Sequence, residues 1–250
     1  MGESRLQIMV CAGTGCVSGG ATRLRQLLGE ALDARGLAGE VEVIPAECNG
    51  LCGQGPVLAV HPDGIIYGPV RPEHIPLLIE EHFINRRPLE RLMLRAPALD
   101  GRVPLMKDVP FFKDQRLIVM RNRGRINPER IEEYIAQDGY FALSKALHEM
   151  TPEGVIDEIK RSGLRGRGGG GFPTGVKWEE VRKYDRFPKY TICNGDEGDP
   201  GAFMDRTVLE SDPHSVLEGM AISAYAIGAH QGYIYVRAEY PLAIQSLETA

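Results

Sequence analysis

Apolar and polar residues along the first 85 positions follow two different periods. Short runs that are β-branched or alternate apolar with polar predict strands, which span residues 5–10, 41–46, 57–60 and 64–67. The last two are joined by a turn at Pro62-Asp63-Gly64. Apolar positions three and four apart predict helices over residues 22–35 and 72–83. The order strand, helix, strand, strand, strand, helix predicts a layered α/β unit.

Residues 86–113 lose this periodicity. They carry mixed charges and several prolines, Pro88, Pro97, Pro104 and Pro110, and are predicted to form a connector. The apolar run at residues 109–112 would either dock onto a neighbouring surface or pack on its own domain. Residues 116–120 are a strand candidate.

The remaining residues alternate helical and strand patterns. Asn127-Pro128-Glu129 predicts a helix start, with a cap and a first-turn proline. Further helices are predicted over residues 140–150, 151–162, 179–183, 215–227 and 241–250, and strands over residues 190–193 and 232–236. These patterns divide the chain into a domain at 1–86, a connector at 87–114 and a second domain at 115–250.

Charge, hydrophobicity and cysteine content argue against several classes of protein. The net charge of −5 argues against a nucleic-acid-binding protein, for which a basic stripe is expected. No apolar run reaches the roughly 18–20 residues of a membrane span, and residues 1–10 lack a secretory h-region. Five cysteines, an odd number, suit a reducing compartment better than a disulfide scaffold. We therefore expect a cytoplasmic protein, or one peripheral on a larger complex.

Four of the cysteines form two pairs, Cys11-x4-Cys16 and Cys48-x3-Cys52, each in a glycine-rich loop that follows a predicted strand. Small residues let backbone curve around an iron–sulfur rhomb and donate N–H groups to its sulfurs. A [2Fe–2S] cluster is the main interpretation, and the predicted layer order fits a thioredoxin-like fold. Structural zinc and two disulfides remain alternatives. Cys193 is interpreted as a buried strand residue rather than a ligand.

A second glycine-rich stretch, G-L-R-G-R-G-G-G-G-F-P-T-G-V-K-W, begins at Gly163. Its glycines can adopt positive φ and lie against a ligand, while Arg165, Arg167 and Lys177 favour a phosphate-bearing cofactor. The spacing also satisfies G-x-G-x-x-G, but the preceding segment is a predicted helix, whereas a dinucleotide fingerprint follows a strand. An ordinary Rossmann loop and a flexible linker are the alternatives. A Walker loop is excluded, since Gly-Lys-Ser/Thr is absent.

The predicted strand at residues 190–193 ends in a polar motif. Asn194, Asp196 and Glu197 follow it directly, and such strand ends face the ligand crevice of open α/β sheets. The alternatives are a solvated acidic turn or a metal site, either of them formed by Asp196, Glu197 and Asp199.

Together with I-C-N-G-D-E and G-Y-I-Y-V-R-A-E-Y, the second glycine stretch resembles the NADH-oxidising flavoprotein subunit of respiratory complex I. The same module occurs in NAD(P)-linked hydrogenases and formate dehydrogenases. The stretches C-A-G-T-G-C-V-S and E-C-N-G-L-C-G-Q-G-P resemble the thioredoxin-like [2Fe–2S] ferredoxin fused ahead of that flavoprotein in electron-bifurcating [FeFe]-hydrogenases. The resemblance implies a thioredoxin-like domain followed by the first part of a Rossmann-like FMN-binding domain.

The resemblance also implies a set of cofactor-binding residues. Phe172 would stack on the nicotinamide side, and Asp199 stands where the family often has glutamate. The implied FMN and NAD(P)H contacts are Gly166, Arg167, Gly168, Gly169, Gly170, Phe172, Lys177, Asn194, Asp196, Glu197 and Asp199. The implied [2Fe–2S] ligands are Cys11, Cys16, Cys48 and Cys52.

The implied function is hydride exchange between NAD(H) or NADP(H) and FMN, followed by single-electron transfer to iron–sulfur clusters. The expected partners are a hydrogenase-type catalytic subunit and a small [2Fe–2S] subunit. The family's later nucleotide segment and its [4Fe–4S] domain have no counterpart here, so the chain is expected to be a fragment or to be completed by another polypeptide. The alternatives are a complex I or formate dehydrogenase subunit, and a non-catalytic [2Fe–2S] carrier or assembly module.

Overall fold

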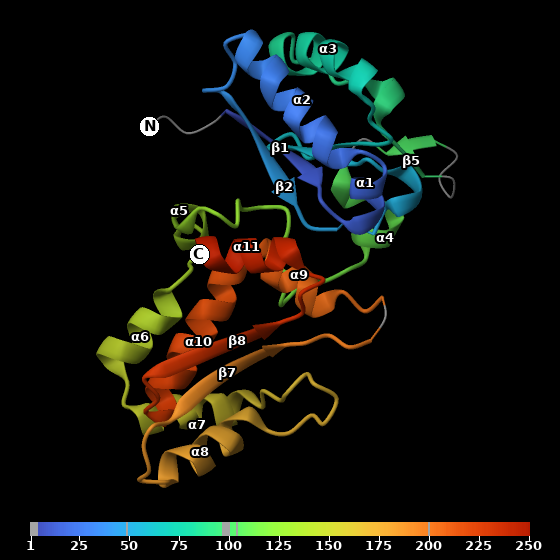
Figure 1. Ribbon diagram of the computed structural model, residues 1–250. Coiled ribbons are helices and arrows are strands. Elements are labelled where there is room, and N and C mark those ends of the chain that lie inside the picture. The colour runs from blue at the N-terminus through green and yellow to red at the C-terminus, as the bar shows by residue number, and fades with distance from the viewer. Residues whose placement is uncertain (1–4, 49, 97–100, 104, 200) are drawn as a thin grey trace. The chain divides into compact units, whose positions relative to one another are not determined.

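The computed structural model describes residues 5–48, 50–96, 101–103, 105–199 and 201–250. Asn49 of the second cysteine loop, and Pro97 and Pro104 of the predicted connector, lie outside the described residues. The chain forms two compact units, Met1–Asn127 and Pro128–Ala250 (Figure 1). None of the described helices combines the length and apolar character needed to cross a lipid bilayer.

The first unit is built on a mixed sheet of strands in the order β2-β1-β3-β4. These strands are β1 (Leu6–Cys11), β2 (Val41–Ala46), β3 (Leu58–His61) and β4 (Ile65–Tyr67). β1 pairs in parallel with β2 and antiparallel to β3, and the β3–β4 hairpin turns at the predicted place. All four predicted strands are confirmed to within one residue at each end.

Two helical segments pack together on one face of this sheet (Figure 1). α2 (Ala21–Ala34) buries Leu24, Leu28 and Leu32 against alternate residues of β1. The second segment is continuous but mixed, with a 3-10 turn (Pro72–His74), α3 (Ile75–Leu78) and a π-helical turn (Ile79–Ile84). The predicted helices at 22–35 and 72–83 are therefore confirmed. Because strand side chains alternate between faces, Met9, Ile44 and Ala59 form a separate cluster.

Residues 86–113 are more ordered than a connector. β5 (Leu94–Ala96) and β6 (Gly101–Val103) form an antiparallel hairpin, and α4 (Pro110–Lys113) follows. Leu92, Met93, Leu94 and Val109 are buried in the core of the first unit. Of the two interpretations of the run at 109–112, packing on its own unit is the one that the structure supports, since Val109 and Phe112 both contact this core.

Two predictions near the boundary of the units are wrong. Residues 116–120 form no strand, and Ile118 and Val119 are exposed. Their β-branched side chains favour extended backbone, but a strand also needs a neighbouring strand to pair with. The helix predicted at Asn127-Pro128 begins later, as α5 (Ile131–Ile135). Asn127 is buried, and its Nδ2 donates to Glu42 Oε1 at 3.3 Å.

The second unit surrounds α10 (Pro213–Ile227), which contacts most of the other elements. The elements before it are α6 (Phe141–Glu149), α7 (Pro152–Ser162), α8 (Thr174–Lys183), β7 (Tyr190–Gly195) and α9 (Met204–Ser211). β8 (Gln231–Val236) and α11 (Pro241–Thr249) follow it. The helices and strands predicted from residue 140 onward are confirmed, although α8 begins earlier than expected.

β7 and β8 pair in parallel, and α10 covers one face of the pair. The other face is largely bare. Four large side chains alternate along it, and each is between 46% and 67% exposed: Tyr190, Ile192, Tyr233 and Tyr235.

A buried polar cluster joins the start of the second unit to α10. Glu218 accepts hydrogen bonds from the Tyr134 hydroxyl (2.5 Å) and from the Tyr140 and Leu143 amides (both 3.0 Å). His214 stacks on Tyr134, and its Nδ1 lies 3.0 Å from the Tyr140 hydroxyl. Burial lowers the pKa of His214 below its ordinary value. Folding therefore favours the neutral imidazole.

This gives a pH-dependent prediction. The pKa of His214 in the folded chain lies below its unfolded value near 6.5. The stability that neutral His214 contributes is therefore fully present above about pH 6.5, and it is lost as the pH falls below this value and the unfolded chain takes up the proton. The His214→Gln variant is expected to lose less unfolding free energy between about pH 7 and pH 5 than the unmodified chain. Urea unfolding at several pH values measures this. His148→Gln, at an exposed position of α6, is the control, and equal pH dependence in all three chains would contradict the prediction.

Candidate functional site

The two cysteine loops lie together at one edge of the first unit's sheet. Cys11 is the last residue of β1, and Cys16 lies in α1 (Thr14–Ser18). Cys48 follows β2, and Cys52 opens a 3-10 turn (Cys52–Gln54). The loops meet because β1 and β2 are parallel neighbours, so their carboxyl ends lie side by side. Backbone bonds from Cys11 to Val57 (3.0 Å) and from Ala12 to Ala46 (2.7 Å) fix the junction.

Glycines of each loop pack directly against cysteines of the other. A Cβ atom on Gly13 would lie 2.7 Å from Cys48 Sγ, and one on Gly15 would lie 3.3 Å from Cys52 Sγ. In return, a Cβ atom on Gly55 would lie 2.9 Å from Cys16 Sγ. Any larger side chain at Gly13 or Gly55 would collide with the sulfur. The glycines are therefore required for the two loops to interlock.

The four thiols influence one another's ionisation. A hydrogen bond from Cys11 lowers the pKa of Cys16 to about 7, and the pKa of Cys11 is raised chiefly by the same bond. The backbone N–H of Gly50 also donates to Cys48 Sγ at 3.4 Å. Cys16 is buried, whereas Cys52 is exposed.

This donor set fits an iron–sulfur cluster. Among the described residues, no three His, Cys, Asp or Glu side chains are gathered as ligands of a metal ion. A [2Fe–2S] cluster is held by four thiolates, and its sulfurs accept hydrogen bonds from N–H donors such as that of Gly50.

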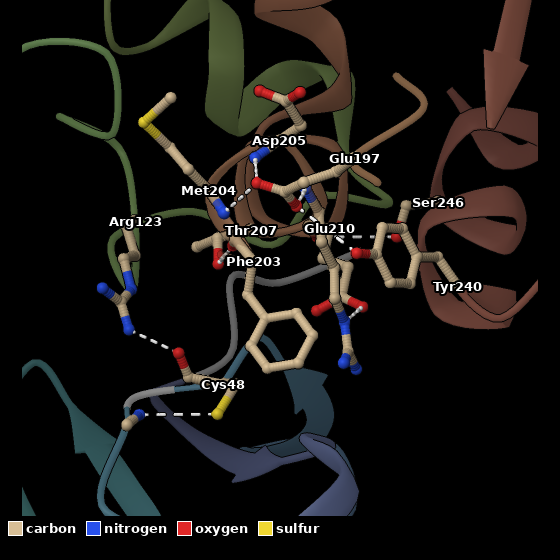
Figure 2. Close-up of polar contacts among 12 residues, drawn as sticks. Cys48, Arg123, Glu197, Phe203, Met204, Asp205, Thr207, Glu210, Tyr240 and Ser246 are labelled. Carbon is tan, nitrogen blue, oxygen red and sulfur yellow. Dashed lines mark hydrogen bonds and ion pairs between the residues drawn. The ribbon is translucent and has the colours of Figure 1, made fainter. Parts of the chain in front are cut away.

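Arg123 holds the Cys48 loop from a distant part of the chain. Its Nε lies 3.2 Å from Glu47 Oε1. Its Nη2 donates to the Cys48 carbonyl at 2.6 Å (Figure 2). Both side chains of this ion pair are largely buried, with 12% of Arg123 and 6% of Glu47 exposed. Sequence reasoning missed Arg123, because nothing in the local pattern indicates a contact spanning 75 residues.

The second glycine stretch forms an exposed loop between α7 and α8. Backbone bonds Gly166 to Phe172 (2.9 Å) and Thr174 to Leu164 (3.0 Å) close its base. Gly169 and Gly171 have positive φ of 97° and 58°. The Arg165 side chain donates to the Gly171 carbonyl at 3.1 Å. The loop therefore presents a curved backbone flanked by the positively charged side chains of Arg165 and Arg167, which suits a phosphate-bearing ligand.

The predicted cofactor-binding residues of this unit differ in their surroundings. In the view of Figure 1, the loop extends toward the same end of the unit as the carboxyl end of β7. The exposed members of the predicted set are Gly166, Arg167, Gly168, Gly169, Gly170, Phe172, Lys177, Asn194, Asp196 and Asp199. Glu197 alone is buried.

The Glu197 carboxylate is directed into the protein (Figure 2). Its Oε1 accepts from the Met204 amide at 2.7 Å and the Asp205 amide at 3.1 Å, and its Oε2 accepts from the Arg206 amide at 3.3 Å. The Arg237 side chain binds the Glu197 carbonyl at 2.6 Å. Glu197 thus caps the first turn of α9 and anchors the loop that precedes it.

Glu197→Ala is therefore expected to lower the unfolding free energy of the ligand-free chain by about 2 kcal/mol, because three N–H groups in the first turn of α9 lose their acceptor. Urea unfolding without added cofactor measures this. The matched control is Asp196→Ala, an exposed carboxylate whose loss should change stability by less than about 0.5 kcal/mol. If Glu197 acted only as a ligand, both variants would be equally stable without cofactor.

Two family models match the chain. Residues 2–82 match the thioredoxin-like [2Fe–2S] ferredoxin family, and residues 159–250 match the Nuo51 FMN-binding domain family. These matches confirm the resemblances seen in the sequence and the predicted fold class.

Curated relatives match about half of the chain. The NADP-reducing hydrogenase protein HndC of Solidesulfovibrio fructosivorans is 59% identical over 138 residues, which are 55% of this chain and 28% of that protein. An NADH-quinone oxidoreductase component of Rhizobium meliloti (strain 1021) is 50% identical over 133 residues, 53% of this chain and 32% of that protein. The chain thus matches about a third or less of these relatives' lengths.

Solved structures are similar at lower identity. A thioredoxin-like [2Fe–2S] ferredoxin from Aquifex aeolicus is 28% identical with a TM-score of 0.33, covering 36% of this chain and 89% of that one. An NAD+-reducing [NiFe]-hydrogenase is 25% identical with a TM-score of 0.44, covering 99% of this chain and 40% of that one.

Proposed function

Because the chain joins a domain of the thioredoxin-like [2Fe–2S] ferredoxin family to one of the Nuo51 FMN-binding family, we propose that it is part of an NAD(P)H-linked electron-transfer subunit. Such a subunit belongs to a multi-subunit oxidoreductase, and an electron-bifurcating hydrogenase is the favoured parent. The relative at 59% identity is a component of an NADP-reducing hydrogenase, which supports a hydrogenase. A respiratory NADH-quinone oxidoreductase is the second candidate, supported by the relative at 50% identity.

The observation that carries the proposal is the interlocked cysteine cradle. Cys11, Cys16, Cys48 and Cys52 would hold the [2Fe–2S] cluster, which supplies one-electron transfer. The close packing of Gly13 and Gly55 on cysteine sulfurs is the arrangement expected of loops that wrap a compact inorganic group. Free cysteines among the described residues also suit a reducing compartment, and we place the protein in the cytoplasm.

The second glycine stretch, hereafter the glycine loop, and the carboxyl end of β7 would bind the flavin and the nicotinamide. FMN supplies hydride and single-electron chemistry when bound. The exposed backbone of Gly166, Gly168, Gly169 and Gly170 would donate to the phosphate, with Arg167 and Lys177 adding positive charge. Asn194, Asp196 and Asp199 would orient polar edges of the ligands, and Phe172, which is 57% exposed, would stack on the nicotinamide. Glu197 would hold the intervening loop in place.

Visible spectroscopy of anaerobically purified protein tests the proposal. After reconstitution with FMN, iron and sulfide, we expect a flavin band that NADH or NADPH bleaches, together with iron–sulfur absorption. Cys16→Ser is expected to lose acid-labile sulfide, whereas Cys193→Ser, on β7, should retain it. Iron–sulfur bands with no flavin binding would instead indicate the non-catalytic carrier or assembly module. Colourless protein that binds zinc would overturn the cluster assignment.

A further inference from the structure

A concave site of about 750 Å³ lies in the first unit, away from the proposed cofactor residues. Its walls come from the β3–β4 turn on one side and from residues 105–125 on the other. The volume is within the roughly 300–1,000 Å³ that is typical of small-ligand sites. Neither family match extends over residues 105–125.

The lining of this site is strongly basic. The segment 105–125 contains six Lys and Arg residues and two Asp residues, although the whole chain has a net charge of −5. All six cations line the site: Lys107, Lys113, Arg116, Arg121, Arg123 and Arg125. The lining includes one carboxylate, Asp63, whose Oδ2 is already engaged by His82 Nε2 at 2.9 Å.

Five of these cations have no partner within the described residues. Arg123 is bound to Glu47 and the Cys48 carbonyl, but the other five side chains form no ion pair or hydrogen bond there. Elsewhere in this unit, arginines meet carboxylates, as in the Arg35–Glu80 and Arg87–Glu81 pairs. Gathering unpaired like charges around a concavity costs electrostatic free energy, which a bound anion would offset.

We propose that this basic site binds a small molecule bearing two or more phosphate groups. Several cations lining one concavity favour a ligand with more than one negative charge, and guanidinium forks match phosphate oxygens in pairs. The concave shape favours a compact ligand over an extended acidic chain. Because Arg123 reaches from this site to the carbonyl of Cys48, the ligand's charge would lie one side chain away from the cluster loop.

Calorimetric titration of the reconstituted full chain with inorganic pyrophosphate tests the proposal. We expect saturable binding at one site, weakened by added salt because part of the attraction is screened. The double variant Arg116→Gln/Arg121→Gln should bind at least about tenfold more weakly, since two charge-assisted hydrogen bonds are removed. Arg86→Gln, an exposed arginine of the same unit outside the site, should bind like the unmodified chain.

Three outcomes would overturn the proposal. The first is that pyrophosphate does not bind saturably. The second is that binding is unchanged in the double variant but lost in Arg167→Gln, which would assign the anion to the glycine loop. The third is that polyglutamate binds but pyrophosphate does not, which would indicate an acidic protein surface as the ligand. Circular dichroism and iron content of the double variant, if unchanged, exclude loss of folding as the cause.

Discussion

Gly13→Ala is expected to prevent the chain from acquiring its [2Fe–2S] cluster. The new Cβ atom would lie 2.7 Å from both Cβ and Sγ of Cys48, closer than nonbonded atoms can approach. The second cysteine loop would have to move away, and forcing an extra methyl group into such a packed site typically costs about 1–3 kcal/mol. Because ligand positions must be held within about half an ångström, such a displacement should abolish cluster assembly.

Iron and acid-labile sulfide per chain, measured after anaerobic reconstitution, check this prediction. Gly53→Ala is the matched control, because it lies in the second cysteine loop and a Cβ atom there would meet nothing within 4 Å. We expect Gly53→Ala to retain its iron and sulfide. Equal cluster content in both variants would show that the loops separate when the cluster binds, and the interlocked arrangement would then be wrong for the loaded protein.

Arg123→Met is expected to produce the largest loss of stability. Removing the guanidinium leaves the buried Glu47 carboxylate without its counter-charge, a change that typically costs about 3–5 kcal/mol. The Cys48 carbonyl loses its 2.6 Å donor at the same time. Urea unfolding of the cluster-free chain measures the effect without a contribution from iron. Arg125→Met, at an exposed neighbouring position, should change stability by less than about 0.5 kcal/mol.

A second substitution separates charge from packing. In Arg123→Met/Glu47→Leu, both members of the buried pair are replaced by apolar side chains, and most of the lost stability should return. If the double variant is as unstable as Arg123→Met, the stabilisation comes from the bond to the Cys48 carbonyl or from packing on Phe112, whose ring centroid lies 5.8 Å from the guanidinium carbon.

The spacing of apolar residues correctly predicted the helices and strands whose buried side chains recur at the period of a helix or a strand. The strand at 41–46 and the helix at 151–162 agree with the structure because their apolar residues face the core at the expected spacing. Residues 116–120 show the limit of this reasoning, since propensity alone does not supply a pairing strand. The β5–β6 hairpin was missed because each strand is only three residues long.

The parts of the candidate site that consist of residues at a characteristic spacing could be predicted from the sequence. The cysteine pairs and the glycine stretch stand out as motifs, and their loops follow elements predicted independently. The roles of Arg123 and Glu197 were not predictable in this way. Arg123 depends on a tertiary contact, and Glu197 is indistinguishable in sequence from its neighbour Asp196 until the backbone directs one carboxylate inward and the other outward.

The uncovered face of β7 and β8 has a practical consequence for handling the protein. Parallel strands are ordinarily sheltered on both sides, yet Tyr190, Ile192, Tyr233 and Tyr235 meet solvent. An exposed surface of three tyrosines and an isoleucine promotes reversible association as the protein concentration rises, and salting-out agents such as sulfate strengthen that association. Light scattering and retention on phenyl resin should therefore increase with ammonium sulfate. Dilute, low-sulfate buffers are the appropriate starting conditions for the titrations described above.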